Sequence, residues 1–384
     1  MDKTILDALK KNNDNALHLL ERFVQIESYS HDKEGVDRLG KDIIDVFSDA
    51  FPVKTERIME VEQGDHLRIQ LGHGGKKILL LSHLDTVYPK GTLKQMPFWI
   101  NEGKAMGPGV LDIKQSYVMV YHLFQLLLQH NSHDLNKVKI VWLLTSDEEI
   151  GSPTGQHVVL AEAQQSEAVL VLEPATNDGK LKSARKGGGN FSLEVLGISA
   201  HAGLNPQDGA NAIEELAYQI TQIVKLADHS RGTTINTGEI RGGDLFNVVP
   251  AYASTKIDVR ILEPDEGIRV ERAFKNLQVK NQRTQLKIHG SVYRPPLLKT
   301  EQTFKLLSLA QKVADDLELK IEDTLVGGGS DGNYAAQTGI PVLDGLGAYG
   351  GFAHAPEEYV WVDSIAERST LVYGILRELL KNSA

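Results

Sequence analysis

An uninterrupted apolar run that stops at a histidine and an acid constrains this chain more than any other stretch. The segment reads KILLLSHLD, and its four aliphatic residues Ile78–Leu81 have no polar residue among them. Such a run is typical of a strand in a sheet that is covered on both faces. His83 and Asp85 then fall at the carboxyl end of the strand, where open α/β sheets bind their ligands. Taken alone, the stretch favours a surface turn after a core strand, with His83 as a structural residue.

Length and composition indicate an ordinary globular protein with more than one domain. The 384 residues exceed the size at which a single hydrophobic core stops growing. The net charge of −10 disfavours nucleic acid and an anionic membrane as main partners, because both select a basic face. The chain has no cysteine, which excludes disulfides, thiol nucleophiles and cysteine-ligated metals. The start of the chain lacks the apolar core of a signal peptide, and no apolar run approaches a membrane span, so a cytoplasmic protein is expected.

Alternating strand and helix patterns predict an α/β fold, with a mostly parallel sheet and helices on both faces. Helical spacing covers residues 2–24 and 33–47, and Asp32 is the predicted N-cap of the second helix. The other elements expected here are strands at 65–71, 138–146, 168–173 and 341–343, a long amphipathic helix at 113–129, and helices at 303–317 and 364–380. The apolar strands are expected to end at His83, Asp147 and Glu173.

A different rhythm of elements begins near Lys186. The patterns predict strands at 191–197, 234–241, 252–262 and 285–290, and helices at 210–226 and 266–276. This βαββαβ order is typical of a small ferredoxin-like α+β unit. We therefore predict a catalytic domain formed by residues 1–185 and 296–384, interrupted by an inserted domain at 186–295. Gly187–Gly189 is the predicted hinge.

Acidic residues follow the apolar strands of the first domain. Asp112 closes GPGVLD at the start of a predicted helix, and its two oxygens can bridge two cations. Glu148 and Glu149 follow another strand, and adjacent acids in a tight turn point different ways. Glu149 can therefore ligate while Glu148 faces the reaction space. Glu173 ends a third strand, and His354 lies in a glycine-rich loop.

Each of these side chains also has a structural explanation. Taken one at a time, each can be explained as a core histidine, a helix cap, a solvated turn residue or a surface histidine. If they all meet at one rim of the sheet, several negative charges gather with little besides a cation to neutralise them. Two histidines with three carboxylates suit a pair of zinc-like cations that share one carboxylate. The combination therefore favours a metal site.

Six segments, in this order, resemble the co-catalytic zinc peptidases and deacylases. That family includes glutamate carboxypeptidase (carboxypeptidase G), acetylornithine deacetylase, aminoacylase and several di- and tripeptidases. The segments are HLD at 83–85, GPGVLDIK at 107–114, SDEEIGS at 146–152, LEP at 172–174, SAHAG at 199–203 and the glycine-flanked His354. The resemblance covers nearly the whole chain. GGGSDGNYAA and GIPVLDGLG most resemble the glutamate carboxypeptidase branch, whereas Glu173 stands where members differ between Asp and Glu.

The resemblance implies a complete set of ligands for two Zn²⁺ ions, with Co²⁺ or Mn²⁺ as substitutes. One zinc would be held by His83 and Glu173 and the other by Glu149 and His354, with Asp112 bridging the two.

Two further residues of the first domain receive catalytic roles from the resemblance. Asp85 would orient His83. Glu148 would be the general base that takes a proton from the attacking water and later hands it to the leaving amine.

The resemblance also assigns residues outside the predicted metal site. His201 in SAHAG matches the position that completes the active site of a partner subunit, where it donates to the oxyanion. A homodimer through the inserted domain, which also acts as a lid, is therefore implied. Arg260 matches the position that binds the substrate carboxylate, with Asn247 as a polar contact beside it. Without the resemblance, a simple turn at His201 and a solvent-exposed arginine are preferred. Lys180 is a weaker candidate for a second substrate anion, and its alternative is a solvated loop lysine.

We therefore predict a zinc-dependent hydrolase that cleaves an amide or peptide bond next to a free C-terminal carboxylate, in a small peptide or an N-acyl amino acid. An N-acyl amino acid deacylase and a di- or tripeptidase are alternatives on the same scaffold. A catalytically silent homologue is disfavoured, because Glu148 accompanies all the expected ligands. A nucleotide-binding protein is disfavoured too, since neither Gly187–Gly189 nor Gly327–Gly329 belongs to a phosphate-loop pattern. The second glycine run is instead expected close to substrate.

Overall fold

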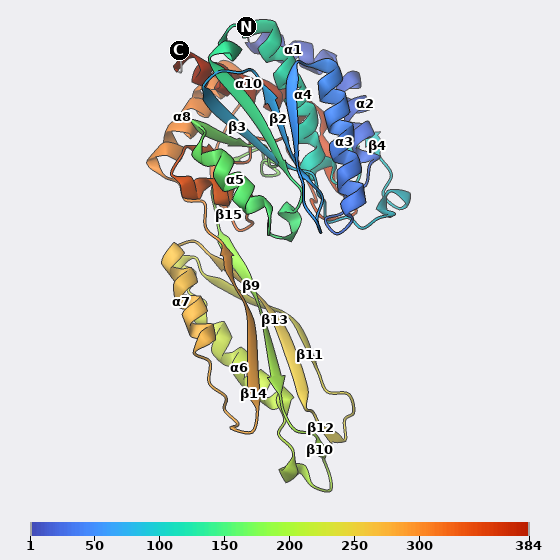
Figure 1. Ribbon diagram of the computed structural model, residues 1–384, viewed down its shortest axis with the longest axis vertical. Helices are drawn as coiled ribbons and strands as arrows, with labels where there is room; N and C mark the ends of the chain where they lie inside the picture. Colours follow the sequence, from blue (N-terminus) through green and yellow to red (C-terminus); the bar gives the residue numbers. More distant parts are fainter. Residues whose placement is uncertain (1, 383–384) are drawn as a thin grey trace. The chain divides into compact units, whose positions relative to one another are not determined.

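The computed structural model describes residues 2–382 and divides into two compact units (Figure 1). Unit 1 comprises Met1–Ala184, Leu298–Leu325 and Ser330–Ala384, and unit 2 comprises Arg185–Leu297 and Val326–Gly329. The short return of the chain to unit 2 was not expected from the sequence. This segment is held in unit 2 because the Arg185 guanidinium donates to the carbonyl oxygens of Gly328 at 3.2 Å and Gly329 at 3.1 Å.

Unit 1 is built on a six-stranded sheet whose central strands are parallel. The strand order is β1 (Val53–Ile58), β2 (His66–Leu71), β6 (Val138–Thr145), β3 (Lys76–His83), β7 (Ala168–Val171) and β16 (Val342–Leu343). The pairs β6–β3, β3–β7 and β7–β16 are parallel, whereas β1 and β2 join antiparallel at one side. The predicted α/β class with a mostly parallel sheet is therefore confirmed.

Both faces of this sheet are covered, as the apolar run in β3 predicted. Ile78 and Leu80 point into the main hydrophobic core with Trp142 of β6. Leu79 and Leu81 lie on the opposite face and are equally buried. The helices of unit 1 are α1 (Asp2–Lys11), α2 (Asn13–Val24), α3 (Lys33–Ala50), α4 (Gln115–His130), α5 (Gly155–Gln164), α8 (Glu301–Asp316), α9 (Gly332–Ala335) and α10 (Val362–Asn382). No helix within residues 2–382 combines the length and the apolar character needed to cross a bilayer.

Short strands complete unit 1. One small sheet has the order β17 (Gly350–Gly351), β18 (Tyr359–Trp361), β5 (Lys104–Met106) and β4 (Trp99–Asn101), and a second pairs β15 (Asp323–Val326) with β8 (Leu181–Arg185). The chain turns between β17 and β18, and this turn carries His354.

Several local predictions for unit 1 were wrong. The first predicted helix is two helices that part at Asn12, and β1 was missed because its side chains are half-buried or exposed and give no core pattern. Asp32 is the N-cap residue of α3, as predicted, although its carboxylate makes no capping hydrogen bond to any residue that the structure describes. The helix predicted as amphipathic at 113–129 is α4, and most of its side chains are buried.

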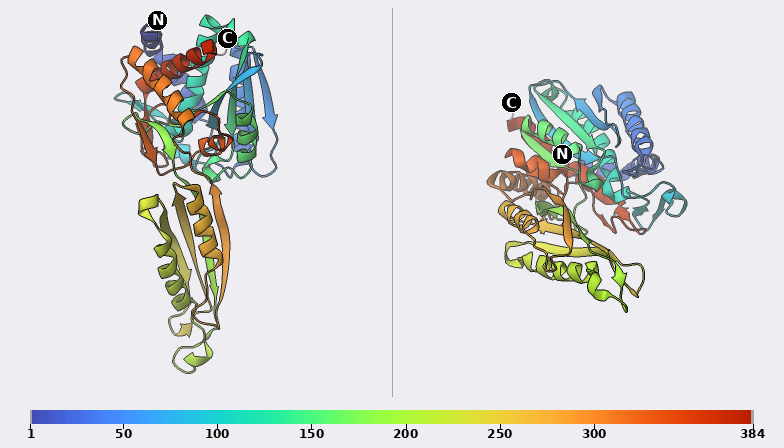
Figure 2. Two further views of the ribbon diagram at one scale, coloured as in Figure 1. Left: turned by 90° about the vertical axis from the view of Figure 1, so that its left-hand side faces the viewer. Right: turned by 60° about the horizontal axis from the view of Figure 1, so that its bottom comes forward.

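Unit 2 is a four-stranded antiparallel sheet with two helices. The chain runs through β9 (Gly187–Leu196), α6 (Ala212–Ile223), β11 (Thr234–Gly242), β13 (Tyr252–Ile261), α7 (Pro264–Lys275) and β14 (Gln285–Arg294), and the strand order is β11-β13-β9-β14. Both helices pack on one face of this sheet (Figure 2). The apolar cluster of unit 2 includes Phe191, Leu216 and Phe274. This is the ferredoxin-like order of strands and helices. A separate two-stranded pair is formed by β10 (Ala200–His201) and β12 (Val248–Val249).

The glycines predicted as a hinge are part of a strand. Gly187–Gly189 is the first part of β9 and pairs with both β13 and β14. A Cβ atom at Gly189 would lie 1.9 Å from the carbonyl oxygen of Ser291. These positions therefore need glycine because two neighbouring backbones approach closely, and not because the chain bends there.

Candidate metal centre

His83 is the last residue of β3 and is almost completely buried. The hydroxyl of Tyr117 donates to its carbonyl oxygen at 2.7 Å. Its Nδ1 lies 2.9 Å from the carbonyl oxygen of Asp85, which leaves Nε2 directed at the acidic cluster. The imidazole is thus fixed by backbone on one side and presents the other nitrogen as a ligand atom.

Asp112 is presented by a tight turn that leads into α4. Gly109, at φ +71°, begins this turn, and a Cβ there would lie 2.7 Å from the methyl group of Thr86. The peptide bond after Asp112 is cis. Oδ1 of Asp112 lies 3.1 Å from Nε2 of His83, and Oδ2 lies 3.4 Å from Nε2 of His354. Each oxygen of this carboxylate therefore faces a different histidine, as a bridging ligand requires.

The acidic turn after β6 contributes Glu149. Asp85 is fully buried, and its two carboxylate oxygens accept hydrogen bonds from the backbone N–H groups of Glu148 and Glu149, each at 3.1 Å. Ser30 donates to the same carboxylate at 2.7 Å. Asp85 was predicted to orient His83, and its carboxylate, at 3.4 Å, is farther from Nδ1 than its carbonyl oxygen is. The carboxylate also fixes the backbone of the two adjacent glutamates.

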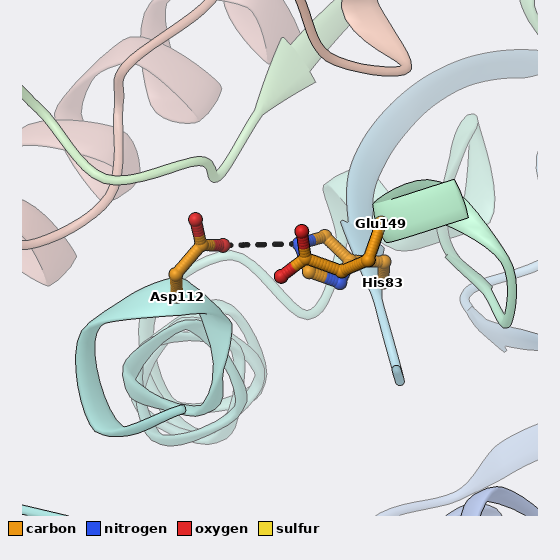
Figure 3. Close-up of side chains that lie close together, drawn as sticks. All are labelled: His83, Asp112 and Glu149. Carbon is orange, nitrogen blue, oxygen red and sulfur yellow. Dashed lines mark hydrogen bonds and ion pairs between the residues drawn. The ribbon is translucent and has the colours of Figure 1, made fainter. Parts of the chain in front are cut away.

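The remaining two predicted ligands reach the same place. Oε1 of Glu173 lies 3.4 Å from Nε2 of His83. Nε2 of His354 lies 3.2 Å from Oε2 of Glu149. Figure 3 shows that His83, Asp112 and Glu149, which come from three separate elements, point toward one another, and one ligand atom from each lies within 4.8 Å of the others. All five predicted ligands are therefore neighbours in unit 1.

The protonation properties of the cluster reflect its crowding with carboxylates. Burial raises the pKa of Glu149 to about 8, although a hydrogen bond to His354 opposes this. Hydrogen bonds to Asp112 and Glu149 raise the pKa of His354 to about 11. Burial opposes charge on His83, yet its hydrogen bonds to Asp112, Asp85 and Glu173 raise its pKa well above the usual value. The carboxylates of the cluster thus favour positive charge beside them, which is the condition that a bound cation would meet.

One atom in the cluster tests whether these residues suit a cation. Oε1 of Glu149 is buried and accepts no hydrogen bond from any part of the chain within residues 2–382. A desolvated carboxylate oxygen without a donor is costly. A cation bound between Glu149 and its neighbours would satisfy this oxygen. The residues therefore fit a bound metal ion, as their side-chain types imply.

Asp147 and Asp331 support the acidic turn from outside. Asp147 accepts hydrogen bonds from the backbone N–H of Thr154 at 2.7 Å and from its hydroxyl at 2.8 Å, directly before α5. Asp331 accepts from the hydroxyls of Thr145, at 2.5 Å, and Ser152, which flank the turn. Asp331 was not predicted as a site residue. The sequence marks it only as an acidic residue that follows a run of glycines.

The predicted substrate residues of unit 2 occupy two places. His201 on β10 is exposed, and its Nδ1 accepts hydrogen bonds from the N–H groups of Gly203 and Leu204, both at 3.1 Å. Asn247 adjoins this segment, since its carbonyl oxygen accepts from the N–H of Ala202 at 3.0 Å. Arg260 on β13 forms an ion pair with Asp258 at 2.9 Å.

Lys180 lies in unit 1 and is engaged by carboxylates. Its Nζ lies 3.1 Å from Asp178 and 3.3 Å from Glu322. These partners compete with any substrate anion.

Comparison with known proteins agrees with this geometry. A sequence model described as peptidase family M20/M25/M40 matches residues 79–378. Carboxypeptidase G2 of Pseudomonas sp. (strain RS-16) is 29% identical over 98% of this chain and 92% of its own length. Acetylornithine deacetylase of Shigella sonnei (strain Ss046) is 25% identical over 64% of this chain and 67% of its own length. The crystal structure of a tripeptidase from Staphylococcus aureus superposes with a TM-score of 0.76 at 20% identity, covering 96% of this chain and 99% of that chain. Because the family match extends over far more than half of its length, the chain belongs to peptidase family M20/M25/M40, a family of hydrolytic metalloenzymes.

Proposed function

We propose that this protein is a zinc-dependent carboxypeptidase that cleaves an amide bond next to a free carboxylate. The observation that carries the proposal is the placement of Asp112, whose two oxygens face His83 and His354 at 3.1 and 3.4 Å. Glu173 stands beside the first histidine and Glu149 beside the second. The similarity to carboxypeptidase G2 over almost the whole chain supports this substrate class.

His83, Glu173, Asp112, Glu149 and His354 would hold two zinc ions. Bound zinc supplies a nucleophile at neutral pH, because it lowers the pKa of water from 15.7 toward about 7. The protein's own contribution is to fix these side chains before substrate arrives, so that little reorganisation accompanies the reaction.

Glu148 is the proposed general base. Asp85 accepts from the backbone N–H of Glu148 at 3.1 Å and from that of Glu149 at the same distance, which fixes the backbone of the turn that carries both side chains. Glu149 is engaged with His354, whereas Glu148 would take the proton of the attacking water and return it to the leaving amine.

The residues of unit 2 are proposed to act on the substrate. Because Nδ1 of His201 accepts two backbone hydrogen bonds, the neutral ring carries its proton on Nε2 and can donate to an oxyanion. We propose that it does so in the active site of a second subunit of a homodimer that forms through unit 2. Arg260 would exchange Asp258 for the substrate carboxylate, with Asn247 as a further polar contact. We do not propose a substrate contact for Lys180, because two carboxylates already form ion pairs with it.

A turnover screen with and without zinc tests this function. Apoprotein prepared with a chelator is supplied with Zn²⁺ and offered three substrate classes: N-acyl amino acids, dipeptides and folate-like glutamates. We expect amide cleavage only after zinc is restored, with preference for substrates that carry a C-terminal acidic residue. Full activity after exhaustive chelation would rule the proposal out.

A deacylase is the second candidate, and the match to acetylornithine deacetylase favours it. In the same screen, a deacylase would prefer short N-acyl amino acids over peptides and folate-like glutamates. The ratio of kcat/KM values between these classes separates the two functions.

A further inference from the structure

Glu358 is a buried carboxylate that contacts the candidate metal centre through backbone N–H groups. It lies four residues after His354 and is 0% exposed. Its Oε1 accepts hydrogen bonds from the N–H of Leu111 at 2.8 Å and from the N–H of Asp112 at 3.0 Å. A carboxylate oxygen that accepts from two successive backbone N–H groups fixes the position of the peptide that provides them.

Tyr88 holds the other end of this carboxylate. Its hydroxyl forms a short hydrogen bond with Oε2 of Glu358 and lies 3.0 Å from the carbonyl oxygen of Ala355, the residue after His354. Tyr88 is itself buried. Glu358 and Tyr88 therefore tie the turn that presents Asp112 to the loop that presents His354, although Leu111 and Glu358 are 247 residues apart in the chain.

The link between these two segments matters because Asp112 is proposed to bridge two cations. A bridging carboxylate serves two cations only if both oxygens point correctly, and small errors in such a geometry weaken a site strongly. His354, in contrast, lies on an exposed loop, and its side chain is 49% exposed. The loop needs an anchor if the histidine is to stay beside Asp112 and Glu149.

We propose that Glu358, assisted by Tyr88, is a positioning residue that sets Asp112 and His354 for metal binding. This inference rests on the proposed function, because it assumes that both residues are ligands. Neither Glu358 nor Tyr88 is assigned to a ligand or a catalytic role. They act through the backbone of Asp112 and of the loop after His354.

The test measures zinc affinity separately from stability. Zn²⁺ is titrated into apoprotein in competition with a chromophoric chelator, and the Tm of each apoprotein is recorded. The variants are Glu358→Ala, Glu358→Gln and Tyr88→Phe, and Glu357→Ala, at the exposed neighbouring position, is the matched control. The visible spectrum of the Co²⁺-loaded protein reports whether the ligand geometry changes.

We expect Glu358→Ala to weaken zinc affinity by about 10–100-fold, the range for residues that support metal ligands from outside. Glu358→Gln should stay closer to the parent protein, because its amide oxygen can still accept from both N–H groups. Tyr88→Phe should lose less than about tenfold, as expected for one hydrogen bond. Glu357→Ala should leave affinity and the cobalt spectrum unchanged.

Three outcomes would overturn the inference. Unchanged zinc affinity in folded Glu358→Ala, or a lower apoprotein Tm with unchanged affinity, would show a merely structural role. If Glu358→Ala does not fold, unchanged affinity and cobalt spectrum in Tyr88→Phe would count against the link in the same way. If the parent protein binds no zinc, the proposed function itself fails, which the control titration of the parent distinguishes.

Discussion

At the scale of residues, Glu148 and Glu149 are adjacent and identical, yet the proposed function gives them different tasks. Asp85 fixes both backbone N–H groups at 3.1 Å, and Glu149 then pairs with His354 at 3.2 Å. A general base must stay off the metals to keep its proton affinity useful, whereas a ligand is consumed by binding. The difference between the two glutamates thus comes from the turn that carries them.

The first prediction concerns Glu148. Glu148→Gln keeps the size of the side chain but removes its ability to accept a proton, so we expect kcat to fall by roughly two to four orders of magnitude. Zinc content should stay at the parent level, because Glu148 is not a proposed ligand. Steady-state kinetics together with metal analysis checks both expectations. Glu167→Gln, at an exposed position, is the control; unchanged turnover in Glu148→Gln would remove Glu148 from its role.

Sequence reasoning identified the five proposed ligands and Asp85, but it missed Glu358 and Asp331. His83, Asp112, Glu149, Glu173 and His354 follow strands or lie in glycine-rich turns, and the family resemblance supplied their order. Glu358 and Asp331 were missed because they act on segments far away in the chain. A carboxylate that accepts from distant N–H or hydroxyl groups has no local pattern in the sequence.

At the scale of elements, β9 depends on glycine because its neighbours leave no room for a side chain. A Cβ at Gly189 would lie 1.9 Å from the carbonyl oxygen of Ser291 in β14, whereas at Gly238 in β11 the nearest atom would be at 3.4 Å. The sequence alone suggested a hinge at 187–189, since glycine runs are typical both of bends and of crowded strands.

The second prediction compares these two glycines. Gly189→Ala should destabilise unit 2 by about 1–3 kcal/mol, because the added methyl group must displace a strand. Gly238→Ala should change the unfolding free energy little. Urea unfolding followed by circular dichroism measures both variants, and equal midpoints for the two would contradict the proposed crowding at β9.

A cluster of charges joins α7 to the start of β11, and it leads to the third prediction. Glu266 accepts hydrogen bonds from Arg269 at 2.6 and 2.7 Å, from Arg231 at 2.5 Å and from the hydroxyl of Thr233 at 2.5 Å. The hydrogen bonds from Arg269, which outweigh desolvation, lower the pKa of Glu266 to about 2 from its usual 4.5. Because the folded pKa is the lower one, Glu266 stabilises the fold above pH 4.5 and loses this contribution as the pH falls toward 2.

Glu266→Gln should therefore lower the Tm at neutral pH, by an amount equivalent to about 1–3 kcal/mol for lost charged hydrogen bonds. The gap in Tm between parent and variant should narrow below pH 4.5. Thermal scans at neutral and acidic pH check this, with the exposed Glu214→Gln as control. A gap that stays constant across the acid range would show that ionisation of Glu266 contributes nothing.

Regular elements were predictable from the sequence where burial was uniform. The strands β3, β6 and β7 follow from apolar runs, and the order of elements in unit 2 follows from the alternation of patterns. The edge strand β1 and the break between α1 and α2 were not predictable. β1 has no face buried in the core, and the break at Asn12 between α1 and α2 interrupts a spacing that remains helical on both sides.

At the scale of the whole molecule, the fourth prediction concerns active sites that are shared between the subunits of the proposed dimer. If His201 serves the active site of a partner, Glu148→Gln and His201→Ala homodimers should each be nearly inactive. After the two are mixed and subunits exchange, about a quarter of the sites should combine an intact Glu148 with an intact His201 from the partner subunit. Recovery of activity over the time of subunit exchange is the measurement. Absence of recovery, with exchange verified by differently labelled subunits, would count against a shared site.

The split of unit 1 along the chain also sets the order in which its metal centre can be completed. His83, Asp112, Glu149 and Glu173 precede unit 2, whereas His354 and its anchor Glu358 follow it. At translation rates of 5–20 residues per second, the interval between Glu173 and His354 is on the order of 10–40 s. During that time the nascent chain carries an acidic cluster that lacks its last histidine. Capture of zinc by all five proposed ligands would therefore be a late event in the biogenesis of this protein, after the C-terminal segment has joined the sheet.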